Sequence, residues 1–309
     1  MVRSSVARRA LDPDPARLLG VVPAIGPVVA VTENFGARLR CDGTYGAPDI
    51  GQHTGIVIGD NIDLRVFPSG FAAAYATAED AERASIVVLD QAGVRSHAIE
   101  LGAGGDRAAY ATAVATLATG VEVAGSLEDS PFARQTAATP EPKTDDASVD
   151  ITAYRAAYAA MTDTHDFFFL LRRFKLEREQ GLRLAGLDFA RPLGPSAYVA
   201  LFEDALEHRI PLMLFVASEG MVQIASGPID DIYRDSAERF CVCSPRASLA
   251  LAPDVLARAW AVTKPTSLGD VTSLELYGAH GELALQVFGE RHAGDAERTD
   301  WHAAVQALG

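Results

Sequence analysis

The chain contains 309 residues, of which 49% are hydrophobic and 22% are charged, and its formal net charge is −14. This composition is typical of a soluble globular protein with one large domain or two domains of about 150 residues. The acidic balance argues against sequence-independent binding of nucleic acid and against docking on anionic lipid, because both need a basic surface.

The longest apolar run, Leu18–Val31, lies near the amino terminus and is interrupted by Pro23 and Pro27. It is too short to cross a bilayer, and no A-x-A-like cleavage site follows it. We therefore expect neither membrane insertion nor a signal peptide.

The three cysteines, Cys41, Cys241 and Cys243, are odd in number and form no disulfide framework, which fits a reducing cytoplasm. Cys241 and Cys243 could be half of a metal site. No second Cys or His pair stands at ligand spacing, so we interpret them as two thiols on one face of a strand.

Alternating and apolar stretches predict more strands than helices. In the first half these strands are expected at 28–33, 37–41, 54–58, 62–67, 71–76, 85–89 and 94–101, and the second half has a comparable set. No helix-length segments separate successive strands, so parallel βαβ units are disfavoured. We expect an α+β fold of antiparallel sheets with helices packed at one side.

A polar segment rich in Pro, Ser, Thr and acidic residues, 125–150, is predicted to link an N-terminal repeat (1–124) to a C-terminal repeat (151–309). The halves look related, because 84–93 aligns with 272–281. Each of these is an alternating strand and a turn ending in Gly, followed by a second strand, which is typical of a β-hairpin. A helical segment is expected after each hairpin.

The two repeats differ at their starts. The second half has two predicted helices at 151–185 ahead of its strands, whereas the first has only the short segment 10–19 before its first strand. We therefore expect a tandem repeat whose first copy is truncated at its start.

One of these helices begins with a histidine. His165, Phe168, Phe169 and Arg172 recur at helical spacing on one face, and Asp163 or Thr164 is expected to cap the helix. The remaining surface is filled mostly by Phe167, Leu170 and Leu171. The helix is therefore predicted to be buried nearly all round.

A second helix is expected from Leu176, with Arg178 just past a basic turn. A histidine on an aromatic wall with arginines nearby suits a flat, apolar, anionic ligand that needs an axial nitrogen, such as haem. Two alternatives stay open for this segment. His165 could be a hydrogen-bonded core residue, or the helix pair could read DNA, which the acidic charge and the bulky aromatics oppose.

The chain resembles the bacterial cytoplasmic haemin-transport and haemin-degrading factor family, the HemS-like proteins. The matching motifs are Thr162–Arg173, Gly227–Ile229, Thr263–Tyr277 and Gln286–Arg291 in the second half, with Gly26–Asn34 and Asn61–Phe67 in the first. The resemblance implies a tandem structural repeat of antiparallel sheets plus helices. It also implies one haem, bound in a cleft on the C-terminal repeat.

The resemblance further implies roles for individual residues. His165 matches the axial ligand of the haem iron, and the residues implied to line the pocket or hold its propionates are Arg178, Lys264, Gln286 and Arg291. The family also supplies an arginine to the other haem face, for which Arg83 is the first choice and Arg65 the second. Phe288 belongs to the same pocket, where it replaces a frequent tyrosine and removes a hydroxyl donor.

Each of these residues also has an ordinary structural interpretation. Lys264 could be a solvated loop lysine before Pro265, Arg178 and Arg291 could be surface charges, and Gln286 could be a plain strand residue. The sequence alone leaves these interpretations open.

Three functions are compatible with these sequence features. The chain could be a cytoplasmic haem carrier that accepts haem from an importer and passes it on, for example to a haem oxygenase. It could instead be an enzyme that opens the porphyrin ring and releases iron. The third interpretation is a duplicated binding or regulatory module without haem, in which His165 belongs to the core.

Overall fold

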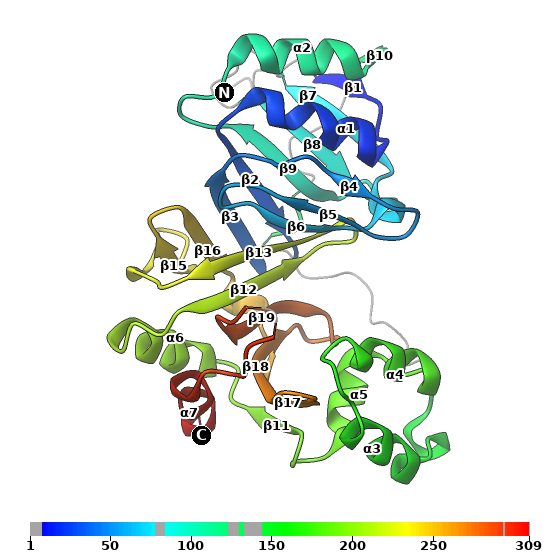
Figure 1. Cartoon of the computed structure of the whole chain (residues 1–309), viewed down its shortest axis with the longest axis vertical. Coiled ribbons are helices and arrows are strands. Elements are labelled where there is room, and N and C mark those ends of the chain that lie inside the picture. Colours follow the sequence, from blue (N-terminus) through cyan, green and yellow to red (C-terminus); the bar gives the residue numbers. More distant parts are fainter. Residues whose placement is uncertain (1–7, 78–83, 123–129, 133–143, 293, 309) are drawn as a thin grey trace. The chain divides into compact units, whose positions relative to one another are not determined.

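The structure, a computed structural model, describes residues 8–77, 84–122, 130–132, 144–292 and 294–308 (Figure 1). Two compact units interleave along the chain. Unit 1 covers Met1–Ala133, Phe215–Ala225 and Cys243–Leu251, and unit 2 covers Arg134–Leu214, Ser226–Val242 and Ala252–Gly309. Two segments of the predicted C-terminal repeat thus cluster with the first unit. The division at 125–150 stays a prediction.

Unit 1 consists mainly of strands. These are β1 (Arg8–Leu11), β2 (Val28–Glu33), β3 (Ala37–Gly43), β4 (Asp49–Ile50), β5 (Gly55–Ile58), β6 (Asp63–Val66), β7 (Ala73–Thr77), β8 (Ser85–Leu89), β9 (Arg95–Leu101), β10 (Ala118–Glu122), β13 (Met221–Gly227) and β16 (Ala247–Leu251). The helical elements are α1 (Pro15–Val21), η1 (Val22–Ile25), η2 (Pro68–Gly70) and α2 (Arg107–Leu117).

The strands of unit 1 pair in the orders β10-β1-β7-β8-β9-β2-β3-β16 and β13-β6-β5-β4, and every pair is antiparallel. Two strands come from the second half of the sequence. β16 pairs with β3, where Leu249 stands opposite Leu39, and β13 pairs with β6, where Met221 stands opposite Val66. Unit 1 is therefore completed by residues more than 150 positions away from the strands that they pair with.

Unit 2 contains more helix. Its strands are β11 (Ala190–Leu193), β12 (Leu212–Ala217), β14 (Asp231–Arg234), β15 (Phe240–Ser244), β17 (Arg258–Thr266), β18 (Gly269–Tyr277) and β19 (Leu283–Gly289), of which β12 and β15 also include residues of unit 1. The helical elements are η3 (Asp146–Ser148), α3 (Ile151–Ala159), α4 (Asp166–Phe174), α5 (Arg178–Ala185), α6 (Ala197–Glu207), η4 (Pro253–Val255) and α7 (Thr299–Ala307).

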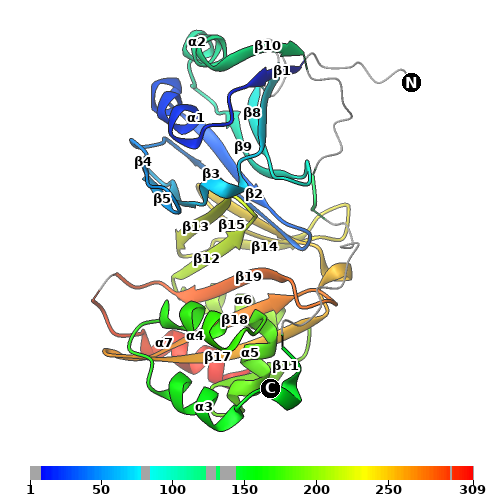
Figure 2. The same cartoon turned by 90° about the vertical axis from the view of Figure 1, so that its right-hand side faces the viewer.

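The antiparallel strands β11-β17-β18-β19 form the centre of unit 2. Helices α3, α4 and α5 form one group, in which α3 packs on β17 and α5 on β11 (Figure 2). Helix α7 packs on β18 and β19, where the fully buried Trp301 donates its indole N–H to the carbonyl of Thr272 at 3.1 Å. Unit 2 is therefore a sheet with helical cover that comes from both ends of its sequence.

The α+β class and the antiparallel pairing are confirmed. Both predicted hairpins form, as β8–β9 and β18–β19, and each is followed by a helix, α2 and α7 respectively. Cys241 and Cys243 lie in strand β15, as their spacing predicts. Within the described residues, none of the helices has the length and apolar character that a membrane crossing requires.

The segment 10–19 differs from the prediction, because Arg8–Leu11 is a strand and the helix begins only at Pro15. The start of α1 is set locally. The Asp14 carboxylate accepts the N–H of Arg17 at 2.8 Å, and Pro15 suits the first helical turn, which needs no donor there.

Candidate functional site

The loop before α4 is held by two aspartates. The Asp166 carboxylate accepts the backbone N–H groups of Thr162 at 2.9 Å and Asp163 at 3.0 Å, and Asp163 in turn accepts the N–H of His165 at 2.8 Å. Such side-chain-to-backbone bonds are typical of Asp in turns. The carbonyl of Thr162 also accepts the N–H of Ser267, which joins this loop to the turn between β17 and β18.

His165 is the N-cap residue of α4, and 88% of its side chain is exposed. Its Nδ1 lies 2.6 Å from Oδ1 of Asp163. Two hydrogen bonds from His165 hold the pKa of Asp163 below its usual range, and the nearby charge of Arg291 acts in the same direction. Since the ionised carboxylate only accepts, Nδ1 carries the hydrogen of this bond, and in the neutral imidazole the lone pair is then on Nε2.

The prediction that α4 is buried nearly all round is wrong. Phe167, Leu170 and Leu171 are buried, whereas Phe168 and Phe169 are 58% and 63% exposed. The helix is amphipathic, because one face packs on α3 and α5 while the face of His165 is exposed. The run of three phenylalanines hides this pattern in the sequence, since aromatic residues lie on both faces. The predicted caps are also wrong, because neither Asp163 nor Thr164 occupies the N-cap.

The turn after α4 places Arg178. Lys175 adopts a left-handed conformation with φ of 57°, and the N–H of Leu176 donates back to the carbonyl of Leu171 at 2.9 Å, which ends the helix. Glu177 then caps α5 through a capping box with Gln180. Arg178 is therefore the first residue of α5, and its side chain is 27% exposed.

The sheet of unit 2 brings further charged residues to the same place. Lys264 lies in β17, Glu275 in β18 and Gln286 in β19, and Gln286 stands directly opposite Glu275 in the register. Lys264 is a buried strand residue with 3% exposure, so the interpretation as a solvated loop lysine is wrong.

Glu275 is the common partner of these side chains. Its carboxylate accepts bonds from Arg178 (Nε to Oε2 at 2.9 Å, Nη2 to Oε1 at 2.6 Å), from Lys264 at 3.1 Å and from Gln286 at 3.0 Å. The hydroxyl of Tyr277 donates to Oε2 at 2.5 Å. Three of the predicted pocket residues thus converge on one fully buried carboxylate.

The charges of this cluster stabilise one another. Burial alone would raise the pKa of Glu275, but the charges of Arg178 and Lys264 and the hydrogen bonds outweigh it and hold that pKa well below its usual value. Burial lowers the pKa of Lys264, and Glu275 offsets only part of that effect. With Arg178 and Lys264 charged and Glu275 ionised, the cluster carries one excess positive charge.

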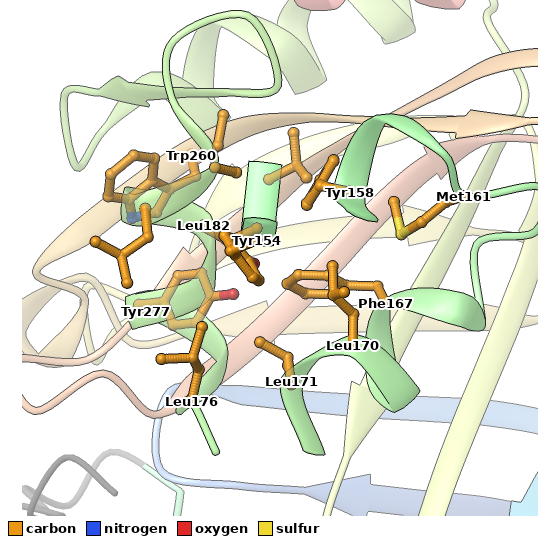
Figure 3. Packing of buried hydrophobic residues seen from close by; sticks show 14 residues of the cluster. Tyr154, Tyr158, Met161, Phe167, Leu170, Leu171, Leu176, Leu182, Trp260 and Tyr277 are labelled. Atoms are coloured by element: carbon orange, nitrogen blue, oxygen red, sulfur yellow. The ribbon is translucent and has the colours of Figure 1, made fainter. Parts of the chain in front are cut away.

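Aromatic rings connect the cluster to α4. Phe167 lies two residues after His165, and its ring centre is 5.2 Å from both the Arg178 guanidinium carbon and the Lys264 nitrogen. The ring of Phe288 lies 5.9 Å from the same nitrogen. Phe167 belongs to a buried cluster with Tyr154, Tyr158 and Tyr277, which fixes its position (Figure 3). Phe167 of α4 therefore contacts both buried cations, which links the helix that His165 caps to the cluster around Glu275.

The other predicted residues are placed as follows. Arg291 is partly buried, its charge reaches Asp163, and its Nη1 donates to the carbonyl of Asp295 at 3.4 Å. Arg65 belongs to unit 1, where it forms an ion pair with Asp63 on strand β6. Arg83 lies outside the described residues.

Three residues of this site were not predicted from the sequence: Asp163 as a partner of His165, Glu275 and Tyr277. Glu275 and Tyr277 alternate on strand β18, within a motif that was interpreted only through its family resemblance. An acidic residue between two leucines, Leu274 and Leu276, is a signal that could have pointed to a buried ion pair, because such a charge needs a partner.

The fold and the site together define an α+β protein with an exposed, carboxylate-paired histidine near a buried group of cations. A family model described as the haemin-degrading HemS.ChuX domain matches residues 2–117 and 175–308. The chain therefore belongs to the HemS/ChuX family. Arg178, Lys264, Gln286 and Arg291 lie within the matched residues, whereas His165 lies between the two matched segments.

Curated relatives and solved structures agree with this assignment. The chain is 32% identical over 310 residues to the hemin transport protein HemS of Yersinia enterocolitica, covering 99% of this chain and 87% of that protein. The apo structure of PhuS, a heme-binding protein from Pseudomonas aeruginosa, matches with a TM-score of 0.87 and 34% identity over 99% of this chain and 88% of that chain. ChuS, described as an E. coli heme oxygenase, matches with a TM-score of 0.83 and 28% identity over 97% and 88%.

Proposed function

We propose that this protein binds haem in the cytoplasm and carries it between import and use, with His165 as the axial ligand of the iron. The observation that carries the proposal is the exposed imidazole, whose Nδ1 is bonded to Asp163 so that Nε2 can bind a metal. A hydrogen bond from Nδ1 to a carboxylate is the usual arrangement for metal-bound histidine, because it fixes the ring and makes Nε2 more basic. The donor set therefore fits a haem iron.

The remaining residues suit the rest of the ligand. Haem is a flat apolar disc with two carboxylates. The exposed rings of Phe168 and Phe169 supply apolar surface on the helix that His165 caps, and the ring of Phe288 lies near Lys264. The excess positive charge of the Arg178–Lys264 cluster, with Arg291, supports propionate binding. In this proposal Arg83, or else Arg65, supplies the opposite face of the haem.

Haem supplies redox and oxygen chemistry when bound, so an enzyme that opens the porphyrin ring is the second candidate. Two observations favour it: the family description names haemin degradation, and the relative ChuS is described as a heme oxygenase. The carrier comes first because an imidazole and a set of cations are sufficient to bind and carry haem. Ring opening also needs a donor that steers oxygen, and the candidate for that role, Arg83, lies outside the described residues. The importer that would deliver haem and the oxygenase that would receive it are part of this proposal.

A haemin titration tests the proposal. Wild-type protein is expected to shift the Soret band, and His165→Ala is expected to change the band position and weaken binding at least about tenfold, because the iron loses its protein ligand. His208→Ala, which removes an exposed histidine at the end of α6, is the matched control and should behave as wild type. Absence of a shift with wild-type protein would exclude both haem functions.

The two haem functions are separated by a second measurement. Electrons are supplied to the haem complex in air, with catalase present to remove free peroxide. Formation of a bilin-like absorbance with release of iron indicates the enzyme, whereas an unchanged haem spectrum indicates the carrier.

A further inference from the structure

The Glu275 carboxylate has no capacity left for a ligand. Its two oxygens offer about four lone-pair positions, and they already accept bonds from Arg178, Lys264, Gln286 and Tyr277. Its side chain is fully buried. Glu275 therefore acts only through the groups that it holds, which include three of the predicted pocket side chains.

We propose that Glu275 is the positioning residue of the site: it orients Arg178, Lys264 and Gln286 so that the cluster recognises a carboxylate of the bound ligand. This inference rests on the proposed function, because it concerns how the same site selects haem by its propionates. It adds a residue whose own carboxylate repels the ligand's carboxylates yet is required for their recognition.

The geometry of Arg178 supports this role. Two bonds to Glu275, together with the bond from Nε to the Tyr277 oxygen at 3.1 Å, fix one edge of the guanidinium. Nη1 takes part in none of these bonds, and the side chain is still 27% exposed. A guanidinium that is held along one edge presents the other at a defined angle, which reduces the entropy lost when it binds an anion.

Lys264 depends on Glu275 for its charge. Its side chain is only 4% exposed, and burial favours the neutral amine. The only hydrogen bond of the amine among the described residues is the one to Glu275 at 3.1 Å. Without that carboxylate the amine loses its proton more easily, so removing Glu275 does not simply add one positive charge to the site. When Glu275 is removed, we therefore expect the loss of positioning to weaken propionate binding more than the loss of its negative charge strengthens it.

The test compares haem with its dimethyl ester, in which the propionates are uncharged. Wild-type protein is expected to prefer haem, and Glu275→Gln is expected to reduce that preference on the order of tenfold, because charged hydrogen bonds to the propionates lose their geometry. The shape of the Soret band should stay that of wild type, since His165 lies at the start of α4 and is bonded to Asp163 rather than to Glu275. Glu203→Gln, an exposed glutamate of α6, is the matched control.

The outcomes are distinct. If Glu275→Gln binds haem with an unchanged or greater preference over the ester, the role of Glu275 is wrong while haem binding stands. If wild-type protein binds neither compound, the proposed function itself fails. A preference reduced in Glu275→Gln and retained in Glu203→Gln supports the proposal.

A second variant covers the case in which Glu275→Gln does not fold. Tyr277→Phe keeps the ring in the core but removes the hydroxyl that donates to Glu275, so it should reduce the preference in the same direction by a smaller factor. If Tyr277→Phe retains the full preference of wild type, Glu275 does not position the site.

A readout without ligand addresses Lys264 directly. The chain has three lysines, Lys143, Lys175 and Lys264, so isotope-labelled lysine gives three assignable side-chain signals in an NMR titration. Lys264 should titrate below its ordinary range in wild type and lower still in Glu275→Gln, which removes the carboxylate that favours the charged amine. An unchanged Lys264 titration in folded Glu275→Gln contradicts the proposal.

Discussion

His97 shows how a single titratable residue can control the acid stability of unit 1. It is completely buried, with Nδ1 2.8 Å from the Thr32 hydroxyl and Nε2 2.6 Å from the Tyr45 hydroxyl. Burial lowers the pKa of His97 from 6.5 to about 3, so the folded protein holds a neutral imidazole. Both neighbours are uncharged hydroxyls, so no negative charge on either compensates a proton on this ring.

This environment predicts a specific dependence of stability on pH. The unfolded chain protonates His97 as the pH falls through 6.5, whereas the folded chain does so only near 3. The contribution is therefore complete above pH 6.5 and is lost toward pH 3 at up to about 1.4 kcal/mol per pH unit. We expect urea unfolding between about pH 7.5 and 4.5 to show a steeper loss of stability in wild type than in His97→Gln. His53→Gln, an exposed histidine of unit 1, is the control, and equal slopes in all three proteins would contradict the prediction.

Asp163 and Glu275 show that acidic residues perform two different tasks in unit 2. Asp163 is 62% exposed and fixes one imidazole by accepting from it, while Glu275 is buried and collects several donors. The exposed pair lies in water, which screens it, so its value is orientation of the ring rather than stability. Removing one member of the buried group of Glu275, Arg178 and Lys264 would leave a buried charge without its partner, which lowers the stability of the fold.

At the scale of elements, the packing of α5 against α3 and α4 decides where Arg178 lies. Gly181 of α5 is buried at this contact, and a Cβ there would lie 2.3 Å from Cδ2 of Leu171 and 2.9 Å from the hydroxyl oxygen of Tyr154. The Tyr154 hydroxyl donates to the carbonyl of Gly181 at 2.9 Å. The glycine therefore permits a close approach of the helices, and any side chain at this position would increase the distance between them.

Gly181→Ala tests this packing. The added methyl group should destabilise unit 2 by about 1–3 kcal/mol through overpacking, although alanine favours helix more than glycine does. Gly194→Ala is the control, because no atom lies within 4 Å of a Cβ at that position, and it should be close to neutral. Thermal unfolding measured by circular dichroism distinguishes the two, and equal melting temperatures would contradict the packing argument.

Helix α4 also shows what periodicity can and cannot establish. The spacing of His165, Phe168, Phe169 and Arg172 correctly placed them on one face, but their aromatic character suggested burial of that face. The buried face is instead that of Phe167, Leu170 and Leu171. With two apolar faces on one helix, only the positions of α3 and α5 decide which face is covered.

At the scale of the whole molecule, unit 1 includes two segments from the second half of the chain, Phe215–Ala225 and Cys243–Leu251. Unit 1 needs β13 and β16 from the second half, which cover the edges of β6 and β3. A side chain also joins β13 to strand β2 of unit 1, since Gln223 donates to the carbonyl of Ala30 at 3.1 Å. Without these strands, two sheet edges would be open.

A truncated chain tests this dependence. A fragment of residues 1–150 should self-associate or lack a cooperative unfolding transition, because its β3 and β6 edges are unpaired. The same fragment joined by a flexible linker to residues 212–251 should remain monomeric. Size-exclusion chromatography with urea unfolding gives the comparison. A monomeric, cooperatively folding 1–150 fragment would contradict the expectation and support a simple division at the predicted linker.

The sequence by itself determined the features that depend on neighbours along the chain. Alternation located strands such as 28–33 and 85–89 at the bounds that the structure has, and Gly-containing turns identified both hairpins. The motifs around His165 and Lys264 identified the family. These features follow from local periodicity and turn chemistry, which a linear pattern records directly.

Only the tertiary structure decided which groups meet. Glu275 binds Arg178 from a helix 97 residues away and Lys264 and Gln286 from two neighbouring strands, so its role depends on the register of three strands and the docking of α5. The assignment of β13 and β16 to unit 1 likewise depends on long-range pairing. Burial, ion pairing and pKa arise from what surrounds a residue in space, and residues distant in sequence supply most of those surroundings.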